Sequence, residues 1–537
     1  MKVVRFGFPS TAHSVAKQTK ADILLIERAN DDVGSLFPGI AFTRGASRQF
    51  GGHFGIDLSV WWGVINGCVT NYSASMHTRA MYISYAAGAK VVQIEGCGWI
   101  DETSGIPYTM ADAADEFGAF VYENMQPEMR GLLDTVIAVI VPPSLGWSET
   151  PTWSGHGSTA WNYANGPSSS LDGVLDGLFG HFFPGVGVYS GYHAFPFGKF
   201  ADNTDPPPSP FARSAITEQF AVSQEDIWMA DSSISFGVFE NRNDAKNWFK
   251  SNEGADPADF RPLEDTRWGD IMDILIDDVD SLSLDLLNSY PIILYHSDAL
   301  SDHTVEKLVQ YVKNGGTLIT AVGAVGTKPM HQKLTGVNFT GSVLGVRAYE
   351  WKDAHFCKNA HLHLAKDRCQ EAEALLIAEA YANPSNNDVE VLVESLPDLL
   401  PVVTRHKLGD GNVYCLMVPW LSSGPGSSVI SHVGVQLIDS LVSQVAAIHL
   451  TKGVPSIAFS SSEYEGTSRY VFVSNNNRLK WSGELNVKLP KSCGEEPIYC
   501  IWLHGEAGSC TKQIQSTDLE LTVESYGVSV IKLSCYW

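Results

Sequence analysis

Three acidic residues, Glu27, Asp57 and Glu95, each lie at the end of a short apolar run that is rich in β-branched residues. They are about 30 and 38 residues apart, which is roughly the length of a strand, a helix and two loops. Carboxylates can act as nucleophile, general acid or general base. If the three strands are neighbours in one sheet, these acids form a candidate catalytic site.

The elements that would position these acids are consecutive strand and helix units. The runs VVRFGF, DILLIE, FGIDLSVWW and KVVQIE are separated by helix-length stretches, and TMADAADEFGAFVYENM follows with helical spacing. This pattern predicts a parallel sheet, whose strands present their carboxyl ends to a ligand. The alternative for any single acid is a structural role as a helix N-cap or loop residue.

Aromatic and basic residues close to the acids indicate which ligand the site would take. Indole rings offer flat apolar faces on which pyranose rings stack, and paired carboxylates cleave glycosidic bonds. Ordinary core packing is the alternative for the indoles. The candidate sugar-binding residues are Trp61, Trp62 and Trp99, with Arg28, Arg44 and His53 as hydrogen-bond donors.

The composition excludes several kinds of partner. The chain has 537 residues and a net charge of −24, so a nucleic acid or an anionic membrane would be repelled. No apolar run reaches the roughly 20 residues of a membrane span, and no secretory leader is recognisable. We therefore expect a cytoplasmic protein, although export is left open because the N-terminus begins abruptly on a strand.

The nine cysteines bear on the same question of compartment. Most are scattered, whereas Cys493, Cys500, Cys510 and Cys535 crowd the end of the chain. We expect mostly buried thiols in a reducing compartment, with one C-terminal disulfide if the protein is exported.

The chain divides into three predicted regions of an α/β multidomain protein. Residues 1–133 form a partial (β/α) barrel, and residues 134–450 form a flavodoxin-like domain with an aromatic-rich insertion at 147–235. Residues 451–537 alternate at period two, which is typical of a small antiparallel β-sandwich. In the middle region, SDHTVEKLVQYVKNGG predicts a helix capped by Ser301, and a second helix pattern covers 427–450.

The motifs RGASRQFG, GIDLSVWWG and YAAGAK resemble the second half of clan A glycoside hydrolase barrels. The order of the three regions resembles that of family 42 β-galactosidases, with an amidotransferase-like middle domain. This resemblance implies that Asp57 occupies the nucleophile's strand, with Glu27 and Glu95 on its neighbours. It places the family's acid/base upstream of Met1, and it implies a homo-oligomer, either dimer or trimer, assembled through the middle domain.

Two other activities find little support in the residues. Amidotransferases need a cysteine nucleophile, and no cysteine lies between Cys97 and Cys357. The segment HFCKNAHLH at 355–363 contains metal-ligand residue types, but its spacing matches no standard zinc pattern. We expect neither a metal nor another cofactor.

The leading hypothesis is a glycoside hydrolase that acts on an oligosaccharide or polysaccharide with two carboxylates. We assign Glu27 and Glu95 as the working pair and Asp57 as nucleophile or orienting group. The alternative is a non-catalytic carbohydrate-binding or assembly protein on an incomplete barrel, because an open half-barrel leaves sheet edges that need a partner.

Overall fold

The computed structural model shows a mixed α/β protein built from several sheets. No helix in the part of the chain that it describes is both long and apolar enough to cross a bilayer. The described residues are 1–6, 11–29, 33–59, 74–95, 109–143, 178, 268–297, 301–322, 329–353, 356, 369–371, 375–382, 388–418, 431–452, 457–475, 480–493, 498–505, 513–514, 517–524 and 527–535.

The N-terminal region contains a parallel sheet of four strands in sequential order, as the spacing predicts. Its strands are β1 (Val3–Phe6), β2 (Ile23–Ala29), β3 (His53–Ser59) and β4 (Val91–Glu95). The helices that connect or follow them are α1 (Ala12–Thr19), α2 (Val33–Phe50), α3 (Ala74–Ala86) and α4 (Thr109–Asn124).

The helices pack on one face of this sheet. Leu24, Ile26 and Ile56 point toward that face and are buried in one core with Phe37 and Ile40 of α2. Because side chains alternate along a strand, the residues between them point to the opposite face. That opposite face therefore carries Glu27 and Asp57.

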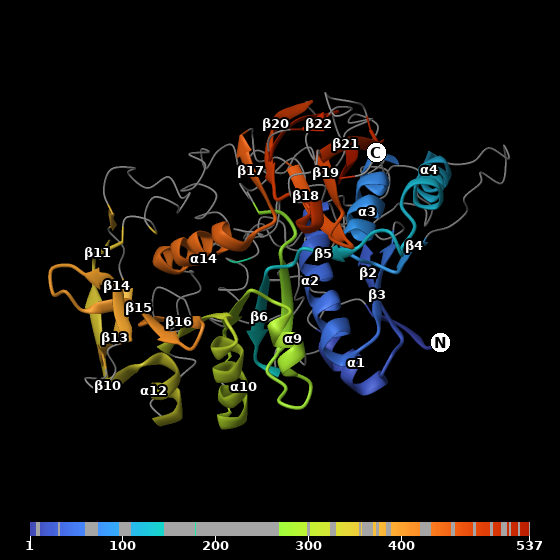
Figure 1. Cartoon of the computed structure of the whole chain (residues 1–537). Helices are drawn as coiled ribbons and strands as arrows, with labels where there is room; N and C mark the ends of the chain where they lie inside the picture. The colour runs from blue at the N-terminus through green and yellow to red at the C-terminus, as the bar shows by residue number, and fades with distance from the viewer. Residues whose placement is uncertain are drawn as a thin grey trace, which may run out of the picture.

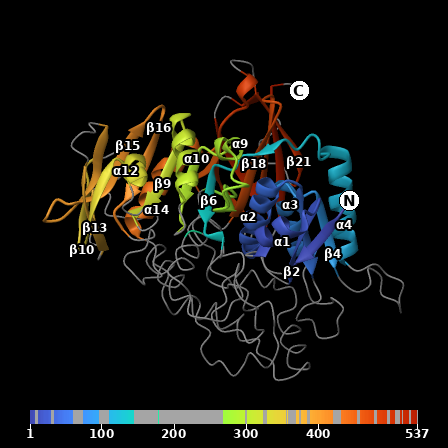
Figure 2. The same cartoon turned by 90° about the horizontal axis from the view of Figure 1, so that it is seen from below.

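The middle region is organised around a nine-stranded sheet that extends away from the N-terminal sheet (Figure 2). Its parallel strands, in spatial order, are β7 (Met272–Ile276), β6 (Ile137–Val141), β8 (Ile292–Tyr295), β9 (Thr317–Ala321) and β16 (Gly411–Leu416). Antiparallel strands continue it as β15 (Pro401–Leu408), β14 (Val389–Ser395), β11 (Tyr349–Trp351) and β12 (Gln370–Glu371), and β10 (Val337–Val346) pairs separately with β13 (Leu375–Ala382). The central strands are buried and almost entirely apolar, as expected for a parallel sheet covered on both faces.

Helix ends in this region follow the predicted capping signals. The Ser301 side chain accepts a hydrogen bond from Thr304 N at 3.0 Å and so begins α10 (Asp302–Lys313), and Gly315 follows with φ +102°. The other helices are α9 (Leu284–Asn288), α12 (Pro329–Thr335) and α14 (His432–Val445).

The prediction of a second helix over 427–450 is wrong at the C-terminal end, because the helix ends at Val445. The chain leaves helical geometry at Ala446, with ψ 136°, and continues as a strand. Ile448 then pairs with Val487 in the C-terminal sheet, where a β-branched side chain packs well.

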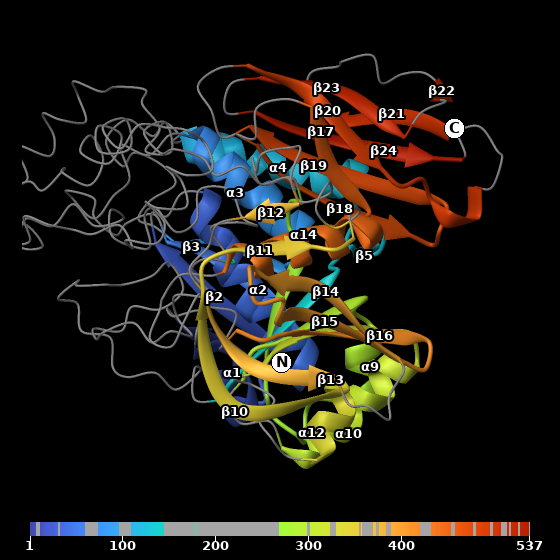
Figure 3. The same cartoon turned by 90° about the vertical axis from the view of Figure 1, so that its left-hand side faces the viewer.

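The C-terminal strands form two antiparallel sheets, which lie at the top of Figure 3 with α10 and α12 at the bottom. One sheet contains β17 (Ile448–Lys452), β20 (Trp481–Val487) and β23 (Asp518–Val523). The other contains β18 (Ile457–Tyr464), β19 (Ser468–Asn475), β21 (Ile498–His504), β22 (Gln513–Ile514), β24 (Val528–Ser534) and, from the N-terminal region, β5 (Leu132–Leu133).

Disulfides correct the prediction of mostly free thiols. Cys493 is bonded to Cys535, which closes the predicted C-terminal bridge, and Cys369 and Cys500 are also disulfide-bonded. Of the cysteines that the structure describes, Cys415 is the free one, and its burial raises the pKa of the thiol to about 12. The sequence could not show which cysteines pair, because the distances between them depend on the fold.

The N-terminal and middle regions join where α2 packs on β7, the edge strand of the nine-stranded sheet (Figure 1). An edge strand leaves outward backbone groups that need partners. Side chains of α1 and α2 supply them. The contacts along β7 are Arg44 Nη2 to Met272 O at 3.0 Å, His13 Nε2 to Ile274 O at 2.9 Å, Gln49 Nε2 to Ile276 O at 2.8 Å, and Ile276 N to Gln49 Oε1 at 3.0 Å.

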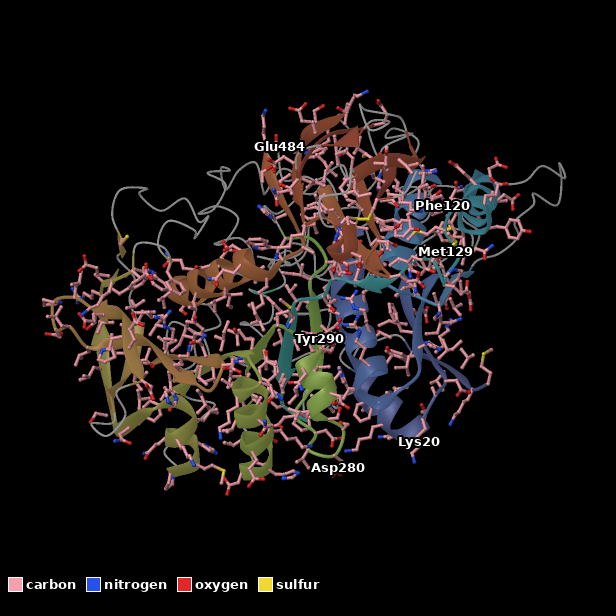
Figure 4. The ribbon with its side chains drawn as sticks, viewed as in Figure 1. Lys20, Phe120, Met129, Asp280, Tyr290 and Glu484 are labelled. Carbon is pink, nitrogen blue, oxygen red and sulfur yellow. A yellow bond between two sulfur atoms is a disulfide. The ribbon has the colours of Figure 1, made fainter. Side chains whose placement is uncertain are left out.

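Buried charges reinforce the same junction. Arg44 donates to both carboxylate oxygens of Asp270, at 2.7 and 2.8 Å, and to Asp273 at 2.6 Å. Burial alone would raise the pKa of Asp273, but the guanidinium groups of Arg44 and Arg48 outweigh it and hold that pKa below its ordinary value. Tyr290, labelled near the centre of Figure 4, also donates to Asp273 at 2.7 Å.

The close approach of α2 to β7 requires glycine at position 45. A Cβ atom on Gly45 would lie 1.8 Å from the carbonyl oxygen of Ile274, which is backbone and cannot move aside. We expect Gly45→Ala to lower the free energy of unfolding by about 3 kcal/mol, at the upper end of overpacking costs. Urea denaturation measures this.

Gly118 is the matched control, because it lies within α4 and a Cβ atom there would meet nothing within 4 Å. Gly118→Ala should raise stability by about 0.5–1 kcal/mol, since alanine restricts the unfolded chain more than glycine does. Equal effects of the two substitutions would contradict the packing of α2 on β7.

The buried His13 predicts acid sensitivity of this junction. Burial lowers the pKa of His13 to about 4, against an ordinary value of 6.5. Between these values the unfolded chain binds a proton that the folded chain does not, so stability falls as the pH drops from about 6.5 to 4. This one group accounts for about 3 kcal/mol over the window.

Replacing His13 with Gln keeps a side-chain donor for Ile274 O but removes the titration. The loss of stability between pH 6.5 and 4, followed by urea midpoints, should become shallower in His13→Gln than in the wild type. The exposed His53→Gln variant is the control. Identical pH dependence in the wild type and His13→Gln would show that His13 is not buried as a neutral ring.

Candidate active site on the four-stranded sheet

The face of the N-terminal sheet that points away from its helices changes from apolar to polar along the strands. One row across the sheet is apolar apart from Arg5 on β1 and contains Leu25, Gly55 and Val91, as the strand register shows. The next row toward the carboxyl ends contains Glu27, Asp57 and Gln93, and the row after that contains Ala29, Ser59 and Glu95. The polar groups therefore collect at the carboxyl edge, where parallel βα sheets bind ligands.

Arg5 bridges the two central acids. Its Nη2 donates to Glu27 Oε2 at 3.3 Å, and its Nη1 forms an ion pair with Asp57 Oδ2 at 3.1 Å. The Asp57 side chain is 0% exposed, that of Glu27 is 17% exposed and that of Arg5 is 38% exposed. Asp57 is thus a buried anchor, whereas Glu27 remains reachable.

The row of residues before the acids is tightly packed, and its position on β3 is a glycine. A Cβ atom on Gly55 would lie 2.6 Å from the Val91 carbonyl oxygen and 2.9 Å from Leu25 Cδ1. Leu25 is 3% exposed and covers the position that a side chain at 55 would occupy. Leu25, Gly55 and Val91 therefore pack closely in the row next to the acidic one.

The structure brings together part of the predicted catalytic set. Glu27 and Asp57 are register partners on β2 and β3. Glu95 ends β4 opposite Ser59, one row beyond Asp57, and its side chain and that of Arg28 lie outside the described set. The predicted indoles Trp61, Trp62 and Trp99 also lie outside the described residues.

Arg44 does not belong to this site, contrary to its prediction as a sugar-binding residue. It is 2% exposed, and its five N–H groups donate to Asp270, Asp273 and backbone carbonyls. The two carboxylates and Met272 O belong to the middle region, more than 200 residues away, so no nearby residue identifies them as acceptors of Arg44. Its role is to join α2 to β7.

His53 is also distant from the acids, although it is only four residues before Asp57. It begins β3, where its backbone N donates to Asp22 O at 2.8 Å. An extended strand separates residues four apart by about 13 Å. His53 therefore lies at the amino end of the sheet, away from the acidic row.

Arg5 is the functional candidate that sequence reasoning missed. The signal available was a basic residue inside the otherwise apolar run VVRF. Alternation places Arg5 on the same face as Glu27, but only the register identifies its two acidic partners.

The middle region offers a second set of polar residues at strand ends, but these residues satisfy one another. Asp277 accepts hydrogen bonds from Tyr295 at 2.5 Å, Thr304 at 3.0 Å and Ser297 at 3.3 Å, and burial raises its pKa. Neighbouring Asp278 pairs with Lys17. Among the residues described, no group of three or more His, Cys, Asp or Glu side chains could hold a metal, and the histidines of 355–363 lie outside them.

The fold is similar to that of several glycoside hydrolases, in agreement with the resemblance inferred from the sequence. A β-galactosidase from Bacillus circulans sp. alkalophilus matches 99% of this chain with a TM-score of 0.51 and 12% identity. A β-galactosidase from Rahnella sp. R3 matches 99% at TM-score 0.51 and 10% identity. An α-L-fucosidase isoenzyme from Paenibacillus thiaminolyticus matches 98% at TM-score 0.51 and 10% identity.

The likeness is one of fold, because the identities are low. The chain spans 63%, 63% and 66% of the lengths of these three proteins, respectively. No family profile matches the sequence, and no curated protein matches it.

Proposed function

We propose that this chain is a glycoside hydrolase that cleaves an oligosaccharide or polysaccharide with two carboxylates. The observation that carries the proposal is the acidic row at the carboxyl edge of β2 and β3, bridged by Arg5. It lies on the face that a closed βα barrel would turn inward, in a fold that glycosidases share. We accordingly infer that the four-stranded sheet is the counterpart of the back half of such a barrel.

The working pair in this proposal is Glu27 and Glu95. Glu27 and Asp57 cannot be the pair that flanks a glycosidic bond, because the Arg5 guanidinium lies between them. Glu27 keeps exposed surface and can serve as the nucleophile, while Glu95, one row further along, supplies the proton. Asp57 is then an orienting group, since its side chain is buried.

The distance between Glu27 and Glu95 would decide the stereochemical outcome. A separation of about 5–5.5 Å lets Glu27 attack the anomeric carbon directly with retention, whereas about 6.5–9.5 Å leaves space for a water and inversion. In either case the acid must be protonated when the substrate binds. Arg28 and the indoles of Trp61, Trp62 and Trp99 remain proposed sugar contacts.

A non-catalytic carbohydrate-binding or assembly protein is the second candidate. Within the described residues β1 is the outer strand of its sheet, and Val3 is 47% exposed. An open edge favours association with further polypeptide. Homo-oligomerisation and a carbohydrate partner remain proposals under both candidates.

Turnover separates the two candidates. A panel of 4-nitrophenyl glycosides, including galactoside, fucoside and mannoside, should be hydrolysed by the full chain. Glu27→Gln and Glu95→Gln should each lower kcat by about 10²–10⁴-fold, because each removes an acid–base or nucleophilic group. Asp57→Asn should lower kcat less.

Glu484→Gln is the matched control, since Glu484 lies on β20 of the C-terminal sheet (Figure 4). It should leave kcat unchanged. Binding of a glycan without release of reducing sugar would favour the non-catalytic candidate, and full activity in both glutamine variants would refute the assignment of the pair.

The disulfides bear on where this activity takes place. Cytoplasmic location remains a prediction, but disulfides persist in oxidising compartments. Four paired cysteines, Cys369, Cys493, Cys500 and Cys535, therefore favour the exported alternative. We propose that the protein binds its substrate outside the cytoplasm.

The Cys493–Cys535 bridge closes a separation of 42 residues between the last strand and the η6 turn (Lys491–Cys493). Replacing both cysteines with serine should lower the free energy of unfolding by about 4 kcal/mol, because the unfolded chain regains loop entropy. Urea denaturation measures this. Replacing Cys415, the buried free thiol, with serine is the comparison. Free thiols at both Cys493 and Cys535 in protein secreted from an oxidising host would contradict the proposal.

A further inference from the structure

We propose that Arg5 is the positioning residue of this site: its guanidinium group holds the Glu27 carboxylate against the buried Asp57 and thereby aims Glu27 at the bound sugar. The inference rests on the proposed function and deepens it. It adds to the three acids a residue from the first strand.

The register shows how Arg5 reaches both acids. Arg5 is level with Leu25, one row below Glu27, so its side chain must extend along the sheet face toward the carboxyl edge. It also crosses β2 to reach Asp57 on β3, which is two strands from its own. A planar guanidinium can donate in different directions from its two terminal nitrogens, whereas a lysine ammonium is a single point charge. Arginine is therefore suited to hold both carboxylates at once.

The exposed fractions of the three side chains indicate which of them a substrate can contact. Asp57 has no exposed side-chain surface, so it can influence a sugar only through a neighbour. Arg5 is such a neighbour, and Glu27, whose side chain is 17% exposed, is the acid that a substrate can contact. A buried acid that fixes a second group, which in turn orients the reacting group, is a general arrangement in nucleophilic catalysis.

The competing explanation is that Arg5 merely ties three strands together. The chain contains a pair of that structural kind, because Arg405 of β15 contacts Glu390 of β14 across a sheet in the middle region. The Arg405 and Glu390 side chains are 35% and 52% exposed, and the exposure of Arg405 is close to the 38% of Arg5. Arg405→Ala is therefore the matched control.

The test compares the full-length wild type with Arg5→Ala, Arg5→Lys and Arg405→Ala, using the aryl glycoside that the wild type cleaves fastest. Arg5→Ala should lower kcat about 100-fold with little change in KM, the cost expected when a reacting group is misplaced by about 1 Å. Its melting temperature should change no more than that of Arg405→Ala. Guanidinium ion at tens of millimolar should restore about 10-fold of kcat in Arg5→Ala and none in Arg405→Ala.

Arg5→Lys keeps the positive charge and is the variant that tests the role of Arg5 if Arg5→Ala does not fold. We expect its kcat to be about 10-fold below that of the wild type, because one ammonium cannot fix both acids. Unchanged kcat in the Arg5 variants, or a loss in Arg5→Ala that guanidinium does not repair, overturns the role of Arg5 while wild-type turnover still supports the proposed function. If the wild type cleaves no glycoside, the proposed function itself has failed, and the role of Arg5 fails with it.

Discussion

The arrangement of this protein depends on the contact between α2 and the edge strand β7. Parallel sheets expose backbone groups at their edges, and β7 would leave three outward carbonyls without partners. Side chains from α1 and α2 satisfy them, and Arg44 adds buried pairs with Asp270 and Asp273. Breaking one partner of such a buried pair costs about 3–5 kcal/mol, so the two regions are held in one orientation.

That orientation determines which face of the N-terminal sheet can serve as a site. Arg5, Glu27 and Asp57 lie on the face opposite the helices, where Glu27 keeps 17% of its side chain exposed, and this is the face on which we propose that a sugar binds. In the neighbouring row of the same face, Leu25 packs closely over Gly55 and so restricts movement of the sheet next to the charged groups. Under the proposed function, this close packing would keep the carboxylates in the geometry that bond cleavage requires.

The sequence predicted the elements well where the signal was local. The four N-terminal strands and the capped helix α10 follow from periodicity and capping residues. It also placed Glu27 and Asp57 in neighbouring positions, because the spacing of βα units fixes the order of parallel strands.

The errors arose where the cause was distant in sequence or hidden in register. The partner Asp273 of Arg44 is 229 residues away, so no nearby residue marks Arg44 as structural. His53 is near Asp57 in sequence but distant along the strand. Arg5 was missed because its link to two acids depends on pairing across three strands.

We propose that a sugar binds at the carboxyl edge of β2 to β4, between Glu27 and Glu95. The decisive measurement is a crystal structure of the full chain soaked with a cationic iminosugar that matches the glycoside it cleaves. The ring nitrogen of the inhibitor should lie beside the Glu27 carboxylate, with Arg5 still bridging Glu27 and Asp57. An inhibitor bound elsewhere, or an acidic row that stays empty at saturating inhibitor, would contradict it.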